Sequence, residues 1–213
     1  MEGTKSVSPQ DNNIKSLHLS CPITCLKLDS SKKFLFVCQG PKVTIFSKLS
    51  QNGIKSWMTH CLTLNDVLPA CRIHGAEFLS KGDDFDQVVF FGQKKFRLGR
   101  FHRSNSYGID GVDAVSLTLD EEAILAPDWL WELKFLRSTT QLALVTAHNQ
   151  LRCYDFDKKE TTYVVDAPES HILYSATIIG DTWDTLVVAA GTVFNCVILW
   201  APKCKEIATL AGC

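Results

Sequence analysis

The chain has 213 residues, of which 46% are hydrophobic and 21% are charged, and its formal net charge is −1. This length suits one large domain or two small ones, and the composition is typical of a soluble globular protein. Because the net charge is close to zero, the chain as a whole does not attract nucleic acid. Any contact with nucleic acid therefore requires a local patch of basic residues.

The amino-terminal stretch MEGTKSVSPQDNN is polar and lacks the apolar core of a signal peptide or a transit helix. We expect residues 1–13 to form a disordered polar arm and residues 14–213 to form the folded part. Without a secretory signal, the nine cysteines indicate a reducing cytosol, in which most of them serve as small core residues. No Cys-x-x-Cys pair occurs and the six histidines lack metal-ligand spacing, so we expect a cytoplasmic protein without a metal or a cofactor.

Short apolar runs recur along the chain, and their starts lie 54, 54 and 44 residues apart. They begin at Phe34, Val88, Leu142 and Leu186. Each run is preceded by one strand-like segment and followed by two, and four short strands per unit of this length are typical of β-propeller blades. The one helix-like stretch, residues 119–133, is interrupted by Pro127 and is expected to form a loop. The sequence therefore predicts an all-β propeller with about four blades, at approximately 20–64, 70–119, 129–167 and 171–212.

Acidic clusters fall between the strands of the second blade and after it. They are DDFD at residues 83–86, which has the composition of paired carboxylates or of a calcium site, and DEE at residues 120–122. Their positions between predicted strands favour a solvated hairpin turn and an exposed loop instead. The common hydrolase, metalloprotease and dinucleotide motifs are absent from the sequence, so nothing supplies the residues of an enzyme site in a central channel.

One basic run stands out, QKKFRLGRFHR at residues 93–103. It contains five cations and no acid, with phenylalanines between them, and such a run can contact a phosphate backbone while an aromatic ring stacks on a base. The candidate RNA-binding residues are Lys94, Lys95, Arg97, Arg100 and Arg103. The same run is also typical of a solvated outer strand whose cations discourage edge pairing, and the sequence leaves both interpretations open.

The most apolar stretch, VVAAGTVFNCVILW at residues 187–200, is too short and too interrupted for a membrane span of about 20 residues. A single glycine without a neighbouring lysine does not form a phosphate loop. We predict a buried strand at residues 186–190 and a second one at residues 196–200. Gly191 and Asn195 are expected to be structural turn residues, because a tight turn needs residues that tolerate unusual backbone angles.

The blades resemble WD repeats, whose third strand often ends in Trp-Asp. The matching pairs here are Phe46-Ser47, Phe101-His102, Tyr154-Asp155 and Trp200-Ala201. Only the third pair approaches the Trp-Asp consensus, although each pair begins with an aromatic residue. The Gly-His dipeptide that opens a new blade in the family is missing. WD propellers usually close with about seven blades. We therefore expect the chain to be a fragment or a truncated isoform of a larger propeller, since an open arc leaves strand edges exposed.

The carboxyl-terminal part is more specific, because AAGTVFNCVILW closely resembles the fourth-blade segment of the WD repeat-containing protein 6 family. The matching residues are Gly191, Thr192, Val193, Asn195 and Trp200. The segment KEIATLAG that follows fits the same place in that family, whereas the resemblance is weak over the first 120 residues. It implies that the chain corresponds to an amino-terminal portion of a longer protein with more than one propeller.

This resemblance implies a non-catalytic partner of a tRNA ribose 2′-O-methyltransferase that modifies the wobble nucleotide in the cytoplasm. Family members are thought to help position the tRNA, while the partner enzyme binds S-adenosylmethionine and transfers the methyl group. No catalytic residues are carried over to this chain. The alternative is a generic WD-repeat adaptor that binds other proteins, for example in signalling. Salt dependence separates the two, because phosphate contacts weaken steeply as salt rises.

Overall fold

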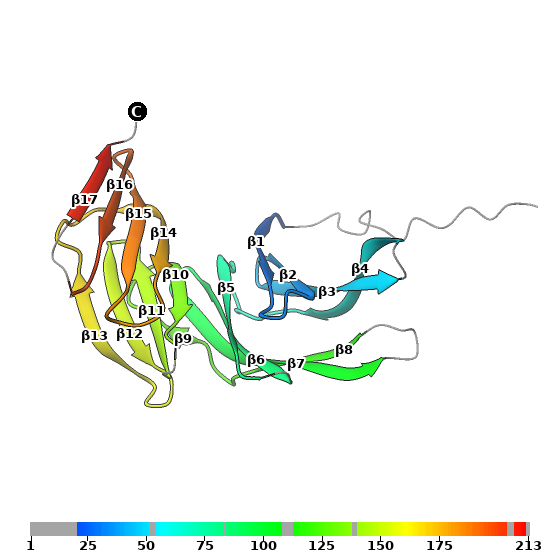
Figure 1. Cartoon of the computed structure of the whole chain (residues 1–213). Helices are drawn as coiled ribbons and strands as arrows, with labels where there is room; N and C mark the ends of the chain where they lie inside the picture. The colour runs from blue at the N-terminus through cyan, green and yellow to red at the C-terminus, as the bar shows by residue number, and fades with distance from the viewer. Residues whose placement is uncertain are drawn as a thin grey trace, which may run out of the picture.

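The computed structural model describes residues 21–51, 54–82, 84–107, 113–137, 140–203 and 207–211. Its strands form four antiparallel sheets, here called blades 1 to 4, and each is built on four strands in chain order, with a fifth short strand added to blade 2 (Figure 1). This arrangement confirms the predicted all-β propeller fold with about four blades. The arm expected at residues 1–13 lies outside the described residues. None of the described segments forms a helix with the length and apolar character needed to cross a membrane.

The four blades divide the chain as follows. Blade 1 contains β1 (Ile23–Leu28), β2 (Phe34–Gln39), β3 (Lys42–Gln51) and β4 (Ile54–Leu64). Blade 2 contains β5 (Gly75–Ser80), β6 (Phe85–Gly92), β7 (Lys95–Tyr107) and β8 (Asp113–Leu119). Blade 3 contains β10 (Leu130–Phe135), β11 (Gln141–Thr146), β12 (Gln150–Asp155) and β13 (Glu160–Asp166). Blade 4 contains β14 (Leu173–Ile179), β15 (Val187–Thr192), β16 (Cys196–Trp200) and β17 (Ile207–Ala211). A short extra strand, β9 (Ile124–Leu125), pairs with β7 inside the segment that was expected to be a loop.

Each blade turns between its second and third strands through a residue with positive φ. These residues are Gly40 (φ 54°), Gln93 (φ 47°), Asn149 (φ 58°) and Asn195 (φ 57°). A left-handed residue gives a tight hairpin turn the twist that its two strands require. The repeated turn is therefore a structural signature of the blades, although a glycine provides it only in blade 1.

The predicted hairpin of blade 4 is confirmed, but one of its two turn residues lies elsewhere. Asn195 occupies the turn with φ 57°, as expected. Gly191 lies inside β15, where it pairs with Ser175 and Val197, and its φ is not positive. The expectation that Gly191 serves the turn is thus wrong, because the turn itself contains Val193–Asn195. A Cβ at position 191 would instead lie 2.9 Å from the Oγ atom of Ser175, so the glycine permits close packing between strands.

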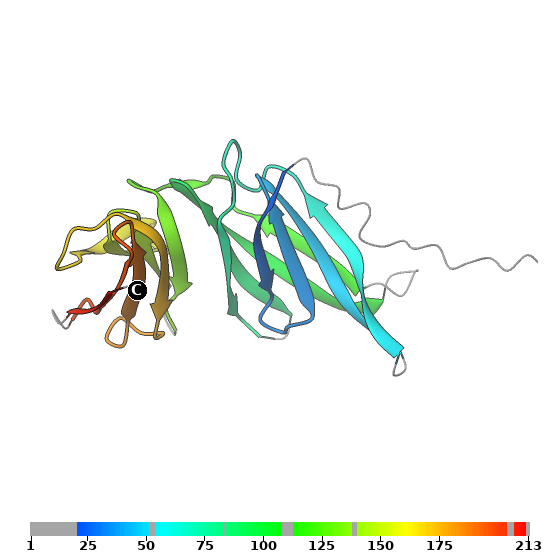
Figure 2. The same ribbon diagram turned by 90° about the horizontal axis from the view of Figure 1, so that it is seen from above.

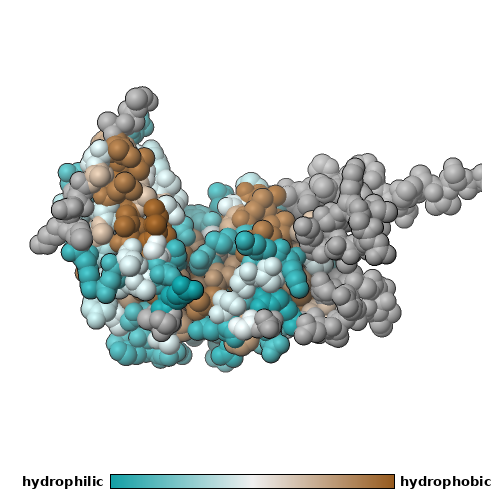
Figure 3. All heavy atoms as spheres, in the orientation of Figure 1, coloured by the Kyte–Doolittle hydropathy of each residue, from teal (hydrophilic) through white to brown (hydrophobic). Residues whose placement is uncertain are grey.

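The core lies between successive blades, because alternate side chains of each strand point to opposite faces of its sheet. Between blades 1 and 2, Phe36 packs edge-to-face against Phe101 with ring centroids 4.9 Å apart. Figures 1 and 2 show the blades following one another, with blades 1 and 4 at the two ends of the row. Hydrophobic residues also gather on the outside of blade 4, over β15–β17 (Figure 3). The cysteines within the described residues are free thiols, and Cys38, Cys71 and Cys153 are buried, whereas the other described cysteines are only partly buried, so fewer belong to the core than expected.

Candidate nucleic-acid interface

Most of the predicted RNA-binding run forms β7, whose alternation divides its cations between two faces of blade 2. Arg97 and Arg103 share a face with Phe101, which packs in the core between blades 1 and 2. Arg100 lies on the opposite face, on the side of Phe96, which packs against blade 3. Lys94 and Lys95 lie at the turn before these residues and at the first position of the strand. The five cations therefore do not form one continuous surface.

Arg103 is held in a buried ion pair between blades 1 and 2. Its Nη1 atom lies 2.8 Å from Asp86 Oδ2 and 3.1 Å from Asp29 Oδ2, and its side chain is only 10% exposed. Its Nη2 atom donates a hydrogen bond to the carbonyl oxygen of Gly82 at 3.1 Å. Burial alone would lower the pKa of Arg103, but the hydrogen bond and charge of Asp86 outweigh this effect and raise it. The guanidinium is thus engaged inside the protein.

The two carboxylates of this pair are themselves fully buried and hydrogen-bonded. Asp29 begins the turn between β1 and β2 and closes it by accepting backbone N–H bonds from Lys33 and Phe34, both at 3.0 Å. Asp86 accepts a backbone N–H bond from Ser30 of the neighbouring blade at 3.0 Å. The expectation of a solvated turn at residues 83–86 is therefore wrong for Asp86, because this carboxylate turns inward and joins blade 1 to blade 2. The loop at residues 120–122 is exposed, as expected.

Arg97 and Lys95 contact backbone carbonyl groups of neighbouring loops. Arg97 donates from Nε to the carbonyl oxygen of Asp120 at 2.7 Å and from Nη2 to that of Glu121 at 3.1 Å. Lys95 donates from Nζ to the carbonyl oxygen of Pro69 at 3.3 Å. These contacts fasten the loops before and after the main strands of blade 2, so both side chains have a structural role that the sequence did not indicate.

Lys94 and Arg100 are the two exposed members of the predicted set. Lys94 borders an open depression of about 410 Å³ between blades 2 and 3. The residues that line it are Lys94, Pro127, Asp128, Thr146, His148, Gln150, Arg152, Asp166 and Ser170. The depression thus places Lys94 near His148 and Arg152, two basic residues of blade 3 that were absent from the predicted set.

The polar residues of this depression form an ordered network. His148 Nδ1 lies 2.8 Å from Asp128 Oδ2, and its exposed ring remains open to solvent. Burial alone would raise the pKa of Asp128, but hydrogen bonds from His148 outweigh it and lower that pKa. Arg152 donates from Nε to Gln150 Oε1 at 2.6 Å, which fixes the direction of its guanidinium. The sequence could have indicated that Lys94 and His148 lie close together, because each falls in the turn between the second and third strands of its blade.

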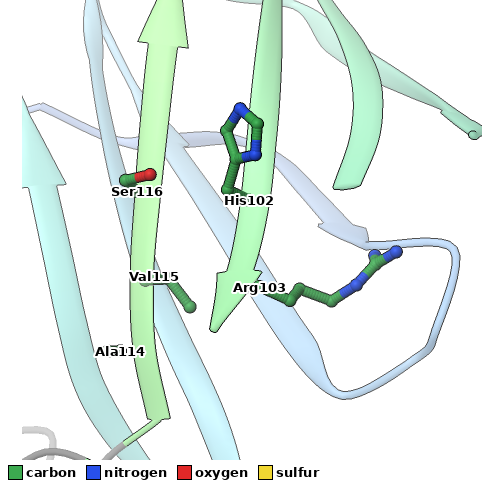
Figure 4. Close-up of a pocket in the computed structure, with 5 residues that line it drawn as sticks. All are labelled: His102, Arg103, Ala114, Val115 and Ser116. Carbon is green, nitrogen blue, oxygen red and sulfur yellow. The ribbon is translucent and has the colours of Figure 1, made fainter. Parts of the chain in front are cut away.

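A second depression, of about 210 Å³, lies beside β7 and β8 and is lined by His102, Arg103, Ala114, Val115 and Ser116 (Figure 4). Figure 4 shows the Arg103 side chain directed away from β8, towards the loop of blade 1 that contains its partner Asp29. Apart from Arg103, the polar side chains that line this depression are one histidine and one serine. In the described part of the chain, no three His, Cys, Asp or Glu side chains converge in a way that could hold a metal ion.

The first strands of successive blades carry a further row of charged residues. Lys27 of β1 forms an ion pair with Glu77 of β5, with 2.6 Å between Nζ and Oε2. Glu132 of β10 lies near both, and burial together with the charge of Glu77 raises its pKa to about 7. Lys134 of β10 donates a hydrogen bond to the carbonyl oxygen of Ile178 at 3.2 Å. The row thus joins blade 1 to blade 2 and blade 3 to blade 4.

Comparison with known proteins identifies both relatives and fold. No protein-family model matches the chain. It is 37% identical over 192 residues to the tRNA (34-2′-O)-methyltransferase regulator WDR6 of Bos taurus, which covers 85% of this chain and 15% of that protein. The regulators of the same name from Rattus norvegicus and Homo sapiens are 36% and 35% identical over 75 residues, which is 35% of this chain and 6% of each protein. This chain thus spans only a small part of the length of these relatives.

Solved structures with low sequence identity share the fold. The WD40 repeats of RRP9 superpose with a TM-score of 0.59 at 13% identity, over 91% of this chain and 52% of that chain. The BBS1N structure, determined in complex with ARL6DN, gives a TM-score of 0.56 at 12% identity, over 97% of this chain and 56% of that chain. These structures show the fold, whereas the 37% identity over most of the chain shows the family. Over the part that it covers, this chain is therefore a member of the WD repeat-containing protein 6 family.

Proposed function

We propose that this chain is a non-catalytic WD-repeat regulator of a tRNA ribose 2′-O-methyltransferase and acts in the cytoplasm. The observation that carries the proposal is the identity of 37% over 85% of the chain to a protein named as the regulator of tRNA (34-2′-O)-methyltransferase. In this role the partner enzyme binds S-adenosylmethionine and performs methyl transfer. The regulator supplies a rigid surface that orients the tRNA and the enzyme.

We place the tRNA contact at the depression between blades 2 and 3. Lys94 and Arg152 provide cations from two blades, and His148 provides an exposed ring that can stack on a base or contact a phosphate. Arg100 offers a separate exposed cation on β7. Arg97 and Arg103 are unsuitable phosphate ligands, because both of their Nη groups bond to the protein itself, whereas Arg152 donates to Gln150 through Nε.

The first experiment measures 2′-O-methylation of nucleotide 34 by the methyltransferase, with unmodified tRNA, in the presence and absence of this chain. We expect stimulation, together with tRNA affinity that falls steeply as salt rises, because released counterions drive phosphate binding. The double substitution Lys94→Ala and Arg152→Ala should weaken tRNA binding and reduce the salt slope. The matched control is Lys158→Ala, since Lys158 is an exposed lysine outside the depression.

Each result has a defined meaning. Stimulation that survives the double substitution but is lost with Arg100→Ala would move the tRNA contact to the outer part of β7. Binding to the enzyme without any tRNA affinity would leave a protein-binding regulator. If the chain neither stimulates nor binds the enzyme, the regulator proposal is wrong and the generic adaptor becomes the better account.

A further inference from the structure

Two cysteines of blade 1 lie directly opposite each other on neighbouring strands (Figure 1). Cys25 of β1 is the cross-strand partner of Cys38 of β2, and the two thiols share a hydrogen bond. Directly opposed residues of an antiparallel pair have Cα atoms about 4.5–5.5 Å apart, and a disulfide requires a Cα separation of about 4.4–6.8 Å. A bridge between Cys25 and Cys38 is therefore compatible with the existing pairing of the two strands.

In the other described sheets, the cysteines that have cross-strand partners face residues of other types. Cys153 lies opposite Ala143 on one side and Tyr163 on the other. Cys196 lies opposite Ala211. Strand pairing therefore distinguishes the thiols of blade 1 from those of blades 3 and 4.

The two thiols of blade 1 differ in their exposure. Cys38 is completely buried in the core between blades 1 and 2, whereas Cys25 is only partly buried. Lys27 lies two positions further along β1, on the same face as Cys25, and its side chain is 42% exposed, so solvent reaches this face. The face is directed towards blade 2, because Lys27 forms its ion pair with Glu77 of β5. The accessibility of Cys25 is thus set by blades 1 and 2 themselves.

The surroundings of Cys25 favour its thiolate. The hydrogen bond from Cys38, a backbone N–H bond from Ala76 and the charge of Lys27 together lower the pKa of Cys25 to about 7, although burial and the charge of Glu77 oppose them. The bond to Cys25, together with burial, raises the pKa of Cys38. About half of the Cys25 side chains are therefore deprotonated at pH 7, and the thiolate is the form of cysteine that reacts with peroxides.

We propose that Cys25 and Cys38 form a site of reversible oxidation, at which hydrogen peroxide converts the two thiols into a disulfide. The Cys25 thiolate attacks one peroxide oxygen, so that an S–O bond forms, the O–O bond breaks and the other oxygen leaves as water after taking a proton. The sulfur of Cys38 then attacks the sulfenic acid of Cys25, which forms the S–S bond and releases the sulfenic oxygen as water. In total, the two thiols lose two electrons and two protons, and one peroxide becomes two waters.

The order of the two steps follows from the shared hydrogen bond. Oxidation of Cys25 removes the thiolate to which Cys38 donates, and this bond is the main cause of the raised pKa of Cys38. Cys38 therefore becomes easier to deprotonate once Cys25 has been oxidised. Cys25 is the attacking thiol and Cys38 is the resolving thiol, and a dithiol reductant reverses the reaction.

The test treats the reduced, full-length chain with equimolar hydrogen peroxide at pH 7. Remaining thiols are blocked with iodoacetamide, and the tryptic peptides are mapped by mass spectrometry. We expect a linked pair of peptides that contains Cys25 and Cys38, is lighter by two hydrogens than the separate peptides and is separated by dithiothreitol. The Cys25 thiol should be consumed at least about tenfold faster than that of Cys153, which is buried and whose pKa is raised by that burial.

Three variants assign the roles. Cys38→Ser should stop the reaction at the sulfenic acid of Cys25, which dimedone labels. Cys38→Ala is a second variant that places no hydroxyl group in the core, in case the serine variant fails to fold. The matched control is Cys21→Ser, because Cys21 is also partly buried and lies on the same tryptic peptide as Cys25. This variant should still form the bridge.

Several results would overturn the proposal. One is a Cys25 thiol that reacts no faster than Cys153. Another is a linked peptide that persists in Cys25→Ser and disappears in Cys21→Ser, because Cys21 would then be the reactive thiol. A wild-type chain that accumulates the sulfenic acid of Cys25 without a bridge excludes Cys38 as the resolving thiol. The site is independent of the proposed tRNA function, so none of these results bears on that function.

Discussion

Arg103→Ala is expected to reduce the free energy of unfolding strongly, although the sequence alone made Arg103 a candidate for contact with nucleic acid. The substitution removes the cation that pairs with both Asp29 and Asp86, whose carboxylates are fully buried. Removing one partner from a buried ion pair costs about 3–5 kcal/mol, because a buried charge is left without compensation. Here two carboxylates on different blades would face each other, so we expect a loss within that range. This is a large part of the roughly 5–15 kcal/mol that stabilises a typical domain.

Urea unfolding monitored by tryptophan fluorescence measures this loss. Arg100→Ala is the matched control, since Arg100 lies on the same strand, is exposed and should change the free energy of unfolding by no more than about 0.5 kcal/mol. Arg103→Lys keeps the charge but cannot reproduce the contacts with both carboxylates and Gly82, so it should give an intermediate loss. A loss below about 1 kcal/mol for Arg103→Ala would refute the reasoning, because it would mean that the ion pair is open to water.

Three further predictions concern stability. Because burial raises the pKa of Glu132 from 4.5 to about 7, the folded state holds this proton more tightly, and stability falls as the pH rises through 7. Glu132→Gln should therefore stabilise the chain at pH 8 by up to about 3 kcal/mol, and this gain should disappear towards pH 4.5. Urea unfolding at the two pH values measures the gain in the free energy of unfolding. A gain that is the same at both pH values contradicts the prediction. Trp200→Phe removes a buried 3.0 Å hydrogen bond to Asn149 and should lower the free energy of unfolding by about 1–3 kcal/mol in a thermal unfolding experiment. Trp129 is half-exposed, so Trp129→Phe should lower it much less. Gly92→Ala should cost about 1–3 kcal/mol in urea unfolding, because its Cβ would overlap a backbone carbonyl oxygen, and an unchanged midpoint would contradict this.

The strands and their grouping could be predicted because their signals are local. The run that begins at Phe34 contains β-branched and aromatic residues bounded by turn residues, and it forms β2. Asn195 was also predictable, since asparagine tolerates the left-handed conformation that a two-strand turn requires. Gly191 was misplaced because a glycine beside a turn signal does not reveal whether it serves the turn or the packing of the strand.

The roles of the charged residues depend on contacts between blades, and no local pattern contains these. Asp86 and Arg103 lie on adjacent strands of blade 2, but their burial depends on Asp29, which lies 74 positions before Arg103. Similarly, Lys94 lines the same depression as His148 and Arg152 only because two blades stand side by side. A cation on a strand looks the same in the sequence whether it faces solvent or a carboxylate of the preceding blade.

The blades keep one backbone plan while their junctions use different polar contacts. Blades 1 and 2 are joined by a buried ion pair, whereas blades 3 and 4 are joined by the hydrogen bond from Trp200 to Asn149. The aromatic residue of the third strand that matches the Trp of the Trp-Asp pair is buried in three blades, as Phe101, Tyr154 and Trp200, while the residue after it varies. Burying a large aromatic side chain contributes about 1.5–3 kcal/mol, more than the roughly 0.5–1.5 kcal/mol of a typical hydrogen bond. A blade can therefore lose the acidic residue of the Trp-Asp pair and remain folded, provided that the aromatic residue stays in the core.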